Sequence, residues 1–290
     1  MTQRLALGTV QFGLPYGIAN EAGQVTREAA AAILQQARHS GLDVLDTAIG
    51  YGNSEQRLGQ IGVDGWRIVS KLPGVPADCH DISTWAHTMV DGALARLRVP
   101  RLHGLLMHSS HDLLGPRAEE VRAALASVRS SGKAAKVGVS VYGPAELDSL
   151  AAGGGVDLVQ APFNLVDRRL ATSGWLRRLH AAGTEVHVRS VFLQGLLLMP
   201  GAQRPPRFAR WRELWSAFDA WLGQQGLAPL EACLAFVLAH PEIDRAVVGV
   251  DSPRQLREIL AAAGRPPIAP PDALASEDPD LINPSRWSSN

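Results

Sequence analysis

Cysteine is scarce in this chain. Cys79 and Cys233 are the only two among 290 residues, and they lie far apart, in neither a metal-binding nor a redox spacing. Such low cysteine usage is typical of a reducing compartment rather than of a disulfide-stapled secreted protein. Residues 1–4 lead into an apolar strand without the apolar core of a signal peptide. We therefore expect a cytoplasmic protein.

An excess of either charge is also missing. Lys plus Arg and Asp plus Glu number 28 each, so no net charge would attract nucleic acid or an acidic membrane surface. The apolar run at 195–199 is too short to span a bilayer. We therefore expect no nucleic-acid partner and no membrane association. Hydrophobic residues make up 46% of the chain, which is enough for a substantial buried core.

A Gly-x-Gly-x-x-Gly turn is absent as well, because Gly8, Gly13 and Gly17 follow the first apolar run at a different spacing. This disfavours an open dinucleotide-binding sheet of the Rossmann type. Short apolar runs instead alternate with amphipathic helical stretches, a pattern typical of parallel βα units. The eight predicted strands are Leu5–Gly8, Asp43–Asp46, Arg67–Ser70, Leu102–Met107, Lys136–Val139, Val156–Gln160, Glu185–Val188 and Arg245–Val248.

Helices are expected between these strands and after the last one. Residues 252–255 form a predicted capping box, with Pro253 at the first helical position. The expected helices lie near residues 27–40, 54–60, 82–97, 116–130, 144–151, 173–182, 208–223, 229–239 and 253–263. Eight strands with connecting helices predict a single (β/α)8 TIM barrel, an α/β fold.

We assign this barrel to residues 1–270 and a C-terminal tail to residues 271–290. Trp287 is one of the few apolar residues of the tail, so we expect the tail to fold over the active face, with a disordered tail as the alternative. The chain also starts almost directly at its first strand.

Four polar side chains stand at or just past the ends of successive predicted strands. Asp46 closes the second strand and Tyr51 follows it, Lys71 follows the third strand, and His108 follows the fourth. The carboxyl ends of the strands form the active face of a parallel barrel, so these side chains would converge there. An acid beside a fixed positive charge is what proton delivery to a carbonyl oxygen requires. The sequence therefore predicts an enzyme.

The motifs that carry these residues resemble those of the aldo-keto reductases. The first motif runs from Leu45 to Gly59 and contains both Asp46 and Tyr51. The resemblance covers nearly the whole chain, and its motifs fall in order on the predicted strands. The further motifs are Ile68–Lys71, Leu105–His108, Lys133–Ser140, Val159–Asn164, Gln194–Leu197 and Val248–Ser252.

The resemblance implies a nicotinamide-dependent oxidoreductase that reversibly reduces an aldehyde or ketone to an alcohol. Tyr51 would be the general acid and base, and the ammonium of Lys71 would lower the phenol pKa from its usual value near ~10. Asp46 would pair with Lys71 and keep it charged. His108 would hydrogen-bond the carbonyl oxygen of a small-molecule substrate. The hydride would come from the nicotinamide, because no side chain can supply one.

Other interpretations of these residues remain open. Taken singly, Tyr51 could be a packing residue, Lys71 a solvated one and Asp46 a helix cap. The four together could also belong to a redox-sensing regulatory protein with an aldo-keto reductase fold. Lys71 could instead form a Schiff base, although pairing with Asp46 would keep it protonated. His111 follows His108 by three residues, but no third ligand is evident, so we expect no metal site.

The same resemblance assigns residues to the cofactor. Three positions differ from the usual family pattern. Arg189 replaces a tyrosine that lies under the nicotinamide in many members. Val141 replaces an asparagine next to Ser140, and Ile259 replaces a second asparagine, near the adenosine. Arginine can also stack on a flat ring, although it brings a charge. The implied cofactor-binding residues are Ser140, Gln160 and Arg189 at the nicotinamide, Ser190, Leu193, Gly195 and Leu196 at the pyrophosphate, and Gly249, Asp251, Gln255 and Glu258 at the adenosine.

The choice between the two nicotinamide cofactors is balanced. NADP(H) is the usual choice in the family, the helix start at 252–255 favours an anion, and Arg254 and Arg257 add positive charge nearby. Asp251 argues for NAD(H), because a carboxylate accepts hydrogen bonds from a ribose but repels a phosphate. Asp251 could equally serve only as part of the helix cap. We favour NADP(H), with NAD(H) as the alternative.

The substrate itself is not identified by the sequence, since the pocket walls come from loops. The loop after His108 is short because Pro116 begins the next expected helix, so we expect an open substrate pocket. We expect a monomer or a small homo-oligomer.

Overall fold

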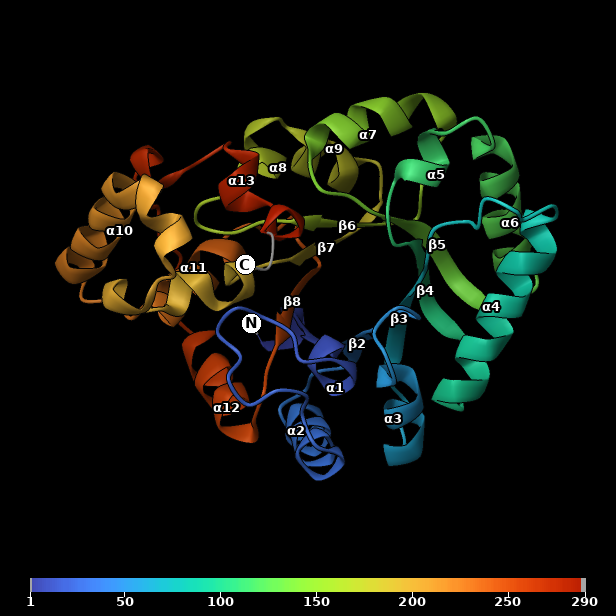
Figure 1. Ribbon diagram of the computed structural model, residues 1–290, viewed down its shortest axis with the longest axis horizontal. Helices are drawn as coiled ribbons and strands as arrows, with labels where there is room; N and C mark the ends of the chain where they lie inside the picture. The colour runs from blue at the N-terminus through green and yellow to red at the C-terminus, as the bar shows by residue number, and fades with distance from the viewer. Residues whose placement is uncertain (1, 288–290) are drawn as a thin grey trace.

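The strands close into a parallel barrel in the order β1 to β8 (Figure 1). This computed structural model describes residues 2–287, so residue 1 of the predicted barrel and residues 288–290 of the predicted tail lie outside the described residues. Leu7 of β1 pairs with Leu45 of β2 on one side and with Val248 of β8 on the other, which closes the ring. The predicted (β/α)8 barrel is confirmed. The strands are β1 Leu5–Gly8, β2 Val44–Asp46, β3 Arg67–Leu72, β4 Leu102–Met107, β5 Ala134–Ser140, β6 Leu158–Pro162, β7 Glu185–Arg189 and β8 Arg245–Gly249.

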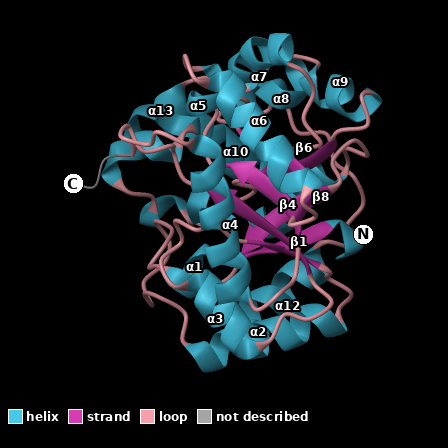
Figure 2. Cartoon of the chain, turned by 90° about the vertical axis from the view of Figure 1, so that its right-hand side faces the viewer, coloured by secondary structure: helices cyan, strands magenta, loops and turns pink. Residues whose placement is uncertain are grey.

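Helices surround the ring of strands, and the side view shows the strands at the centre of the molecule (Figures 1 and 2). Among the described residues, no helix is long and apolar enough to cross a membrane. The helices are α1 Val10–Gly13, α2 Arg27–His39, α3 Ser54–Ile61, α4 Ile82–Leu97, α5 His111–Leu114, α6 Ala118–Ser130, α7 Pro144–Leu150, α8 Arg169–Thr172, α9 Trp175–Ala181, α10 Arg212–Gln225, α11 Pro229–Leu238, α12 Pro253–Ala262 and α13 Pro279–Ile282.

Several element boundaries differ from the sequence prediction. The expected helix at 116–130 begins at Ala118, and the short helix α5 precedes it in the loop after β4. The helix expected at 173–182 is α9, Trp175–Ala181, and the short helix α8 precedes it, with Gly174 in the left-handed conformation between the two. Strand β3 continues through Lys71 to Leu72, because these two residues still pair with Leu106 and Met107 of β4.

The barrel interior is filled by a small apolar layer. Side chains on a strand alternate between its two faces, so every second residue points to the barrel axis. A larger core lies between the outer faces of the strands and the helices, and it includes Leu45, Ile68 and Phe163. The interior layer consists of Ala6, Val44, Val69, Leu106, Leu158 and Val247.

Arg4 secures the base of the barrel just before β1. Its guanidinium donates hydrogen bonds to the carbonyl oxygens of Leu238 at 2.7 Å and Ile243 at 2.8 Å, and to that of His240. These carbonyls belong to the end of α11 and the turn before β8. One side chain thus joins the first and last strands at the end of the barrel opposite the active face.

The C-terminal tail packs against loops that follow β6 and β7. The Ser276 N–H donates to the carbonyl of Val166, Arg168 donates to the carbonyl oxygens of Pro270 and Pro271, and the Trp287 ring meets Phe208 edge to face at 4.9 Å. In Figure 2, α13 of the tail lies on the same side of the barrel as α1 and α5, which follow the carboxyl ends of β1 and β4. The described part of the tail, residues 271–287, therefore lies on the side of the active face.

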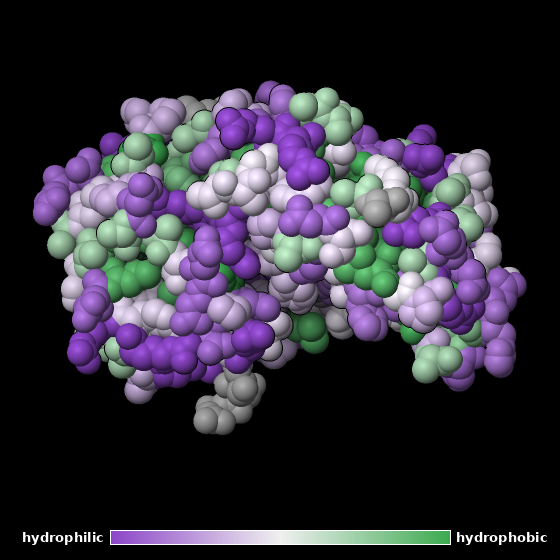
Figure 3. All heavy atoms as spheres, turned by 90° about the horizontal axis from the view of Figure 1, so that it is seen from above, coloured by the Kyte–Doolittle hydropathy of each residue, from purple (hydrophilic) through white to green (hydrophobic). Residues whose placement is uncertain are grey.

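The side of the molecule that carries α7 and α9 is mainly hydrophilic (Figures 1 and 3). Apolar residues appear there as small patches separated by polar ones. A mixed surface of this kind is normal for a folded chain, since single exposed apolar residues are common. The predicted monomer or small homo-oligomer stays a prediction.

Candidate active site

A polar layer lies directly above the apolar layer of the barrel interior. Asp46 comes two residues after Val44, and Lys71 comes two residues after Val69. Residues separated by two point to the same face of a strand, so the polar side chains continue the interior column at the carboxyl ends of the strands. His108 and Gln160 follow Leu106 and Leu158 in the same way.

Asp46 and Lys71 form a buried ion pair at the centre of this polar layer. Lys71 Nζ donates to both carboxylate oxygens of Asp46 at 2.8 Å and to the carbonyl of Thr47 at 3.0 Å. Lys71 is only 1% exposed. Gln160 Nε2 also donates to Asp46 Oδ1, at 2.6 Å, so the carboxylate is held from two strands. A buried charge needs such a set of partners to remain ionised.

Tyr51 lies between this ion pair and His108. Its ring meets the His108 imidazole edge to face at 5.6 Å, and Lys71 Nζ lies 5.1 Å from the ring centroid. The turn that carries Tyr51 is fixed by Ser54, whose hydroxyl donates to the carbonyl of Thr9 at 2.8 Å. The structure therefore brings together Asp46, Tyr51, Lys71 and His108, the four residues that the sequence assigned to catalysis.

Glu55 fixes the helix that follows Tyr51. Its buried carboxylate accepts hydrogen bonds from Ser70 of β3 at 2.6 Å and from Arg96 of α4 at 2.8 Å. The first turn of α3 is thus tied to the strand that carries Lys71. Glu55 therefore stabilises the fold, and it can affect the reaction only by positioning the turn that carries Tyr51.

The pKa of Tyr51 corrects one expectation. Burial raises the phenol pKa, and this effect exceeds the lowering by the charge of Lys71. The net pKa therefore lies above its usual value of 10.0, although a lowered pKa was expected. The expectation considered only the nearby ammonium, whereas removal of the phenolate from water is the larger effect. Tyr51 is consequently protonated at neutral pH.

Lys71 and His108 lie in the same buried surroundings, but Lys71 is charged and His108 is neutral. Burial acts to lower the pKa of Lys71, but its interactions with Tyr51 and above all with the carboxylate of Asp46 outweigh burial and raise this pKa above its usual value. For His108, burial and the charge of Lys71 lower the pKa to about 4. At neutral pH the site therefore has a cationic lysine, a neutral imidazole and a neutral phenol.

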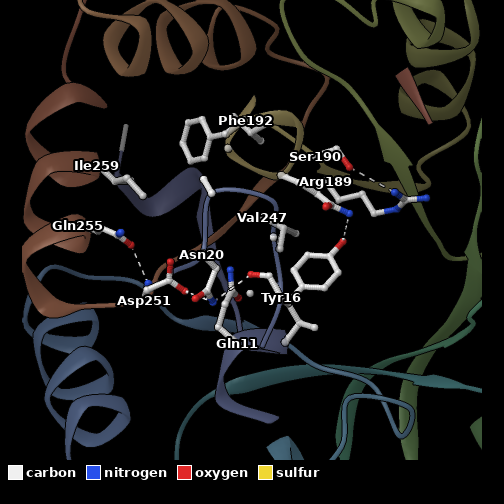
Figure 4. Close-up of a pocket in the computed structure, with 18 of the residues that line it drawn as sticks. Gln11, Tyr16, Asn20, Arg189, Ser190, Phe192, Val247, Asp251, Gln255 and Ile259 are labelled. Carbon is white, nitrogen blue, oxygen red and sulfur yellow. Dashed lines mark hydrogen bonds between the residues drawn. The ribbon is translucent and has the colours of Figure 1, made fainter. Parts of the chain in front are cut away.

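A cavity of about 350 Å³ opens from this centre and runs towards α12. Asp46, Tyr51 and Gln160 lie at its barrel end, and Gln255 and Ile259 of α12 lie at the other (Figure 4). Of the residues predicted to bind or act on the cofactor, those in its walls are Asp46, Tyr51, Gln160, Arg189, Ser190, Gly195, Gly249, Asp251, Gln255 and Glu258.

Three predicted cofactor residues are not in the cavity wall. Leu193 and Leu196 are fully buried in the hydrophobic core. Ser140 is buried on β5, in register with Gln160 on β6. Any contact of the two leucines with a ligand would have to come from their backbone, since their side chains belong to the core.

Arg189 is the last residue of β7, and its charge acts on two of the predicted catalytic residues. Its guanidinium donates to the carbonyl of Val141 at 3.1 Å and to the Ser190 hydroxyl at 3.4 Å, and it lies 4.8 Å from the centre of the Tyr142 ring. One side of the cation is thus occupied by Tyr142. Its charge lowers the pKa of both Tyr51 and His108, as a minor contribution beside burial.

The sequence analysis missed the segment between β1 and α2, residues 9–26. Gln11, Tyr16 and Asn20 of this segment line the cavity (Figure 4). None of them lies in a motif that pointed to the site. The length of the segment was the available signal, because βα connections of a barrel are commonly about 2–6 residues and longer ones are usually functional.

The comparisons with known proteins agree on one family. The model of the aldo/keto reductase family matches residues 4–269. A solved structure from Pseudomonas aeruginosa, described as an aldo-keto reductase, is 25% identical, with 90% of this chain and 88% of that chain covered and a TM-score of 0.65. No match was found among curated proteins.

Two further solved structures share the fold at lower identity. The aldo-keto reductase AKR11C1 from Bacillus halodurans, in its holo form, is 17% identical with a TM-score of 0.73. The glycerol dehydrogenase AKR11B4 from Gluconobacter oxydans is 20% identical with a TM-score of 0.70. For both, 92% of this chain and 88% of that chain are covered. At these identities the likeness shows the fold alone.

Proposed function

This chain belongs to the aldo/keto reductase family, and from that membership we propose that it reversibly reduces a small aldehyde or ketone to an alcohol with a nicotinamide cofactor. The carrying observation is the buried Asp46–Lys71 pair beside a protonated phenol and a neutral imidazole, of which Asp46 and Tyr51 lie in the cavity wall. The proposed setting is the cytoplasm, and the proposed partner is a small carbonyl compound.

The cavity suits a dinucleotide in two respects. At the barrel end, Gln160 Oε1 is buried and has no hydrogen-bond partner among residues 2–287, so a carboxamide N–H would satisfy it. Gly195 and Gly249 expose their backbone along the cavity wall, so a flat or extended ligand can approach the main chain closely. A bound nicotinamide would supply the hydride, which no side chain can provide.

Tyr51 is the proposed proton donor. Because its pKa lies above the usual value, the phenol holds its proton at neutral pH and can donate it to a carbonyl oxygen that becomes an alkoxide. The phenolate left behind lies beside the ammonium of Lys71, which stabilises it. His108 is neutral and offers a ring N–H to the same oxygen, which orients the substrate without adding a second positive charge.

Replacing Tyr51 with Phe tests this assignment. The variant removes one hydroxyl, so turnover of a panel of aldehydes, ketones and sugars should fall by at least ~10²–10⁴-fold, the usual contribution of a positioned acid. The dissociation constant of the cofactor, measured by fluorescence titration, should stay close to the wild-type value. Tyr142→Phe is the matched control, because the Tyr142 hydroxyl makes no hydrogen bond to the described residues.

Retention of most of kcat in Tyr51→Phe would contradict the proton-donor role. A wild-type protein that binds nicotinamide but turns over none of the panel would instead favour the alternative, a redox-sensing regulatory protein. An enzyme and a regulatory protein are distinguished by measuring cofactor binding and the change in nicotinamide absorbance on the same preparation.

The Schiff-base alternative is opposed by the surroundings of Lys71. A nucleophilic lysine needs a free lone pair, but Nζ donates to three acceptor oxygens of Asp46 and Thr47, and its pKa is raised. Borohydride treatment in the presence of a carbonyl substrate should therefore leave no mass increase on Lys71. A reduced adduct at this residue would overturn the proposed role of its charge.

A further inference from the structure

The start of α12, at the far end of the cavity, has few free hydrogen-bond donors. The Ser252 hydroxyl accepts from the Gln255 N–H at 3.3 Å, and Gln255 Oε1 accepts from the Asp251 N–H at 2.7 Å. Pro253 has no N–H, and the Leu256 N–H donates to the Ser252 carbonyl. A helix start attracts an anion through its unpaired N–H groups, and at these positions they are already used.

The arginines near this end also offer less positive charge for a phosphate than the sequence suggested. Arg254 lines the cavity but pairs with Glu258 at 2.9 Å, one turn along the same helix. Arg257 is not in the cavity wall, and its guanidinium donates to Gln36 of α2 at 3.4 Å. The sequence analysis counted both arginines in favour of a phosphate. Their positions remove most of that support.

Asp251 is the remaining charge at this end, and it faces the cavity. Its Oδ1 atom accepts a hydrogen bond from Asn20 Nδ2 at 3.3 Å, which holds the carboxylate between Asn20 and Gln255 (Figure 4). Asn20 is fixed in turn, because its Oδ1 accepts from the Gly23 N–H at 2.8 Å. Asp251 therefore does more than extend the helix cap.

Apolar side chains complete this end of the cavity. Phe192 and Ile259 both lie there, with the Phe192 ring on the side of Ile259 in Figure 4, and Leu230 is also in the wall. A flat base can pack against such groups, and the sugar attached to it then lies near the polar side chains. The end of the cavity thus offers an apolar surface and a carboxylate acceptor, but no unpaired cation among the described residues.

We propose that Asp251, held by Asn20, accepts hydrogen bonds from the adenosine ribose hydroxyls and so makes NAD(H) the preferred cofactor over NADP(H). This inference rests on the proposed function and reverses the preference drawn from the sequence. A 2′-phosphate carries nearly two negative charges and would replace a hydroxyl donor with acceptor oxygens only. At this position it would meet a carboxylate, and few N–H groups are left to offset the repulsion.

Binding of the reduced cofactors tests the inference without turnover. In wild-type protein at low salt, titration of NADH and NADPH by cofactor fluorescence should give a dissociation constant at least tenfold lower for NADH. Asp251→Asn keeps the shape of the side chain and removes its charge, so the NADPH affinity should rise and the ratio should shrink by about tenfold. Asp251→Ser should change the ratio in the same direction. Higher salt should also reduce the ratio in wild-type protein, because screening weakens the repulsion.

Arg257→Ala is the matched control. Its side chain points to α2, so both dissociation constants should stay within about twofold of wild type. A wild-type protein that binds NADPH more tightly than NADH overturns the inference, and so does a loss of NADPH affinity in Arg257→Ala. An unchanged ratio in Asp251→Asn, with the melting temperature preserved, overturns it as well. If neither cofactor binds wild-type protein at millimolar concentration, it is the proposed function that fails.

Discussion

Burial keeps two titratable groups of the site uncharged, while a third keeps its charge. The pKa of Tyr51 is raised and that of His108 is lowered to about 4, in both cases chiefly because the charged form would lose its hydration. Lys71 escapes the same effect because Asp46 supplies a carboxylate at 2.8 Å. The site thus has one fixed positive charge and two neutral hydrogen-bond donors, which suits donation to an oxygen that gains negative charge.

The lowered pKa of His108 should appear in the pH dependence of stability. Between pH 6.5 and about 4, the unfolded chain binds a proton at this imidazole that the folded chain does not, so the free energy of unfolding falls as the pH falls through this range. His108→Gln removes the titration. Its free energy of unfolding should therefore decrease less than that of wild type between pH 7 and pH 4.5, as measured by urea denaturation.

His180→Gln provides the control for this measurement. His180 is exposed on α9, so its variant should follow the wild-type pH dependence. Equal slopes for His108→Gln and wild type would show that the imidazole is not held neutral in the folded protein.

The sequence located the four residues that we propose to be catalytic, but not the net effect of their surroundings. Asp46, Tyr51, Lys71 and His108 could be found because their spacing follows the strands, and strands place every second residue on the barrel axis. The sign of the Tyr51 pKa shift could not be found in this way. It depends on how completely the surrounding loops exclude water, and the sequence gives no measure of that.

At the scale of elements, the turn that carries Tyr51 is held by direct backbone contact with α1. A Cβ atom at Gly13 would overlap the Tyr51 carbonyl oxygen and lie 2.8 Å from the Ser54 nitrogen. Gly52, next to Tyr51, has a φ of 55° and faces the Gly13 carbonyl in the same way. Two glycines therefore let the loop after β1 and the loop after β2 touch, and this contact sets the position of the phenol.

Gly13→Ala should displace the Tyr51 turn. We expect a loss of about 1–3 kcal/mol of folding stability from overpacking. We also expect a fall in kcat on the order of 10²-fold, since a shift of about 1 Å in a catalytic group is enough for that. The dissociation constant of the cofactor should change much less than kcat, because Gly13 is not in the cavity wall. Urea denaturation, steady-state kinetics and fluorescence titration give the three values.

Gly223→Ala is the control for the added methyl group. Gly223 lies within α10 and a Cβ there would meet no atom within 4 Å, so this variant should be slightly more stable and fully active. If Gly13→Ala keeps the wild-type kcat, the contact between α1 and the Tyr51 turn does not position the phenol.

The elements that were predicted least well are those whose ends depend on distant partners. β6 runs two residues past its predicted end and stops at Pro162, which is in register with Arg189 of β7. The short helices α5 and α8, which lie in the loops after β4 and β6, were not predicted. By contrast, the helix at 82–97 was predicted exactly to the residue, since its apolar spacing and its Asp81 cap are local.

At the scale of the whole molecule, residues 16–20 join parts of the chain that lie far apart in sequence. The Tyr16 hydroxyl accepts a hydrogen bond from Gln194 Nε2 at 3.1 Å. Ala19 lies so close to Gly195 that a Cβ atom added at residue 195 would be 2.5 Å from the Ala19 Cβ. At the other end, Asn20 bonds to Asp251. This segment therefore crosses the cavity from the loop after β7 to the loop after β8. A bound dinucleotide would contact all three loops at once.

Tyr16→Phe should weaken this crossing without touching the catalytic residues. It removes a single neutral hydrogen bond, which is worth ~0.5–1.5 kcal/mol, so the dissociation rate constant of NADH should rise about two- to tenfold in a stopped-flow displacement experiment. The melting temperature of the free protein should hardly change, because Tyr16 is 41% exposed. Tyr142→Phe is again the matched control, since that ring is similarly exposed and its hydroxyl makes no hydrogen bond to the described residues. A dissociation rate equal to that of wild type would show that the cofactor leaves without opening the contact between Tyr16 and Gln194, and that the segment only lines the cavity.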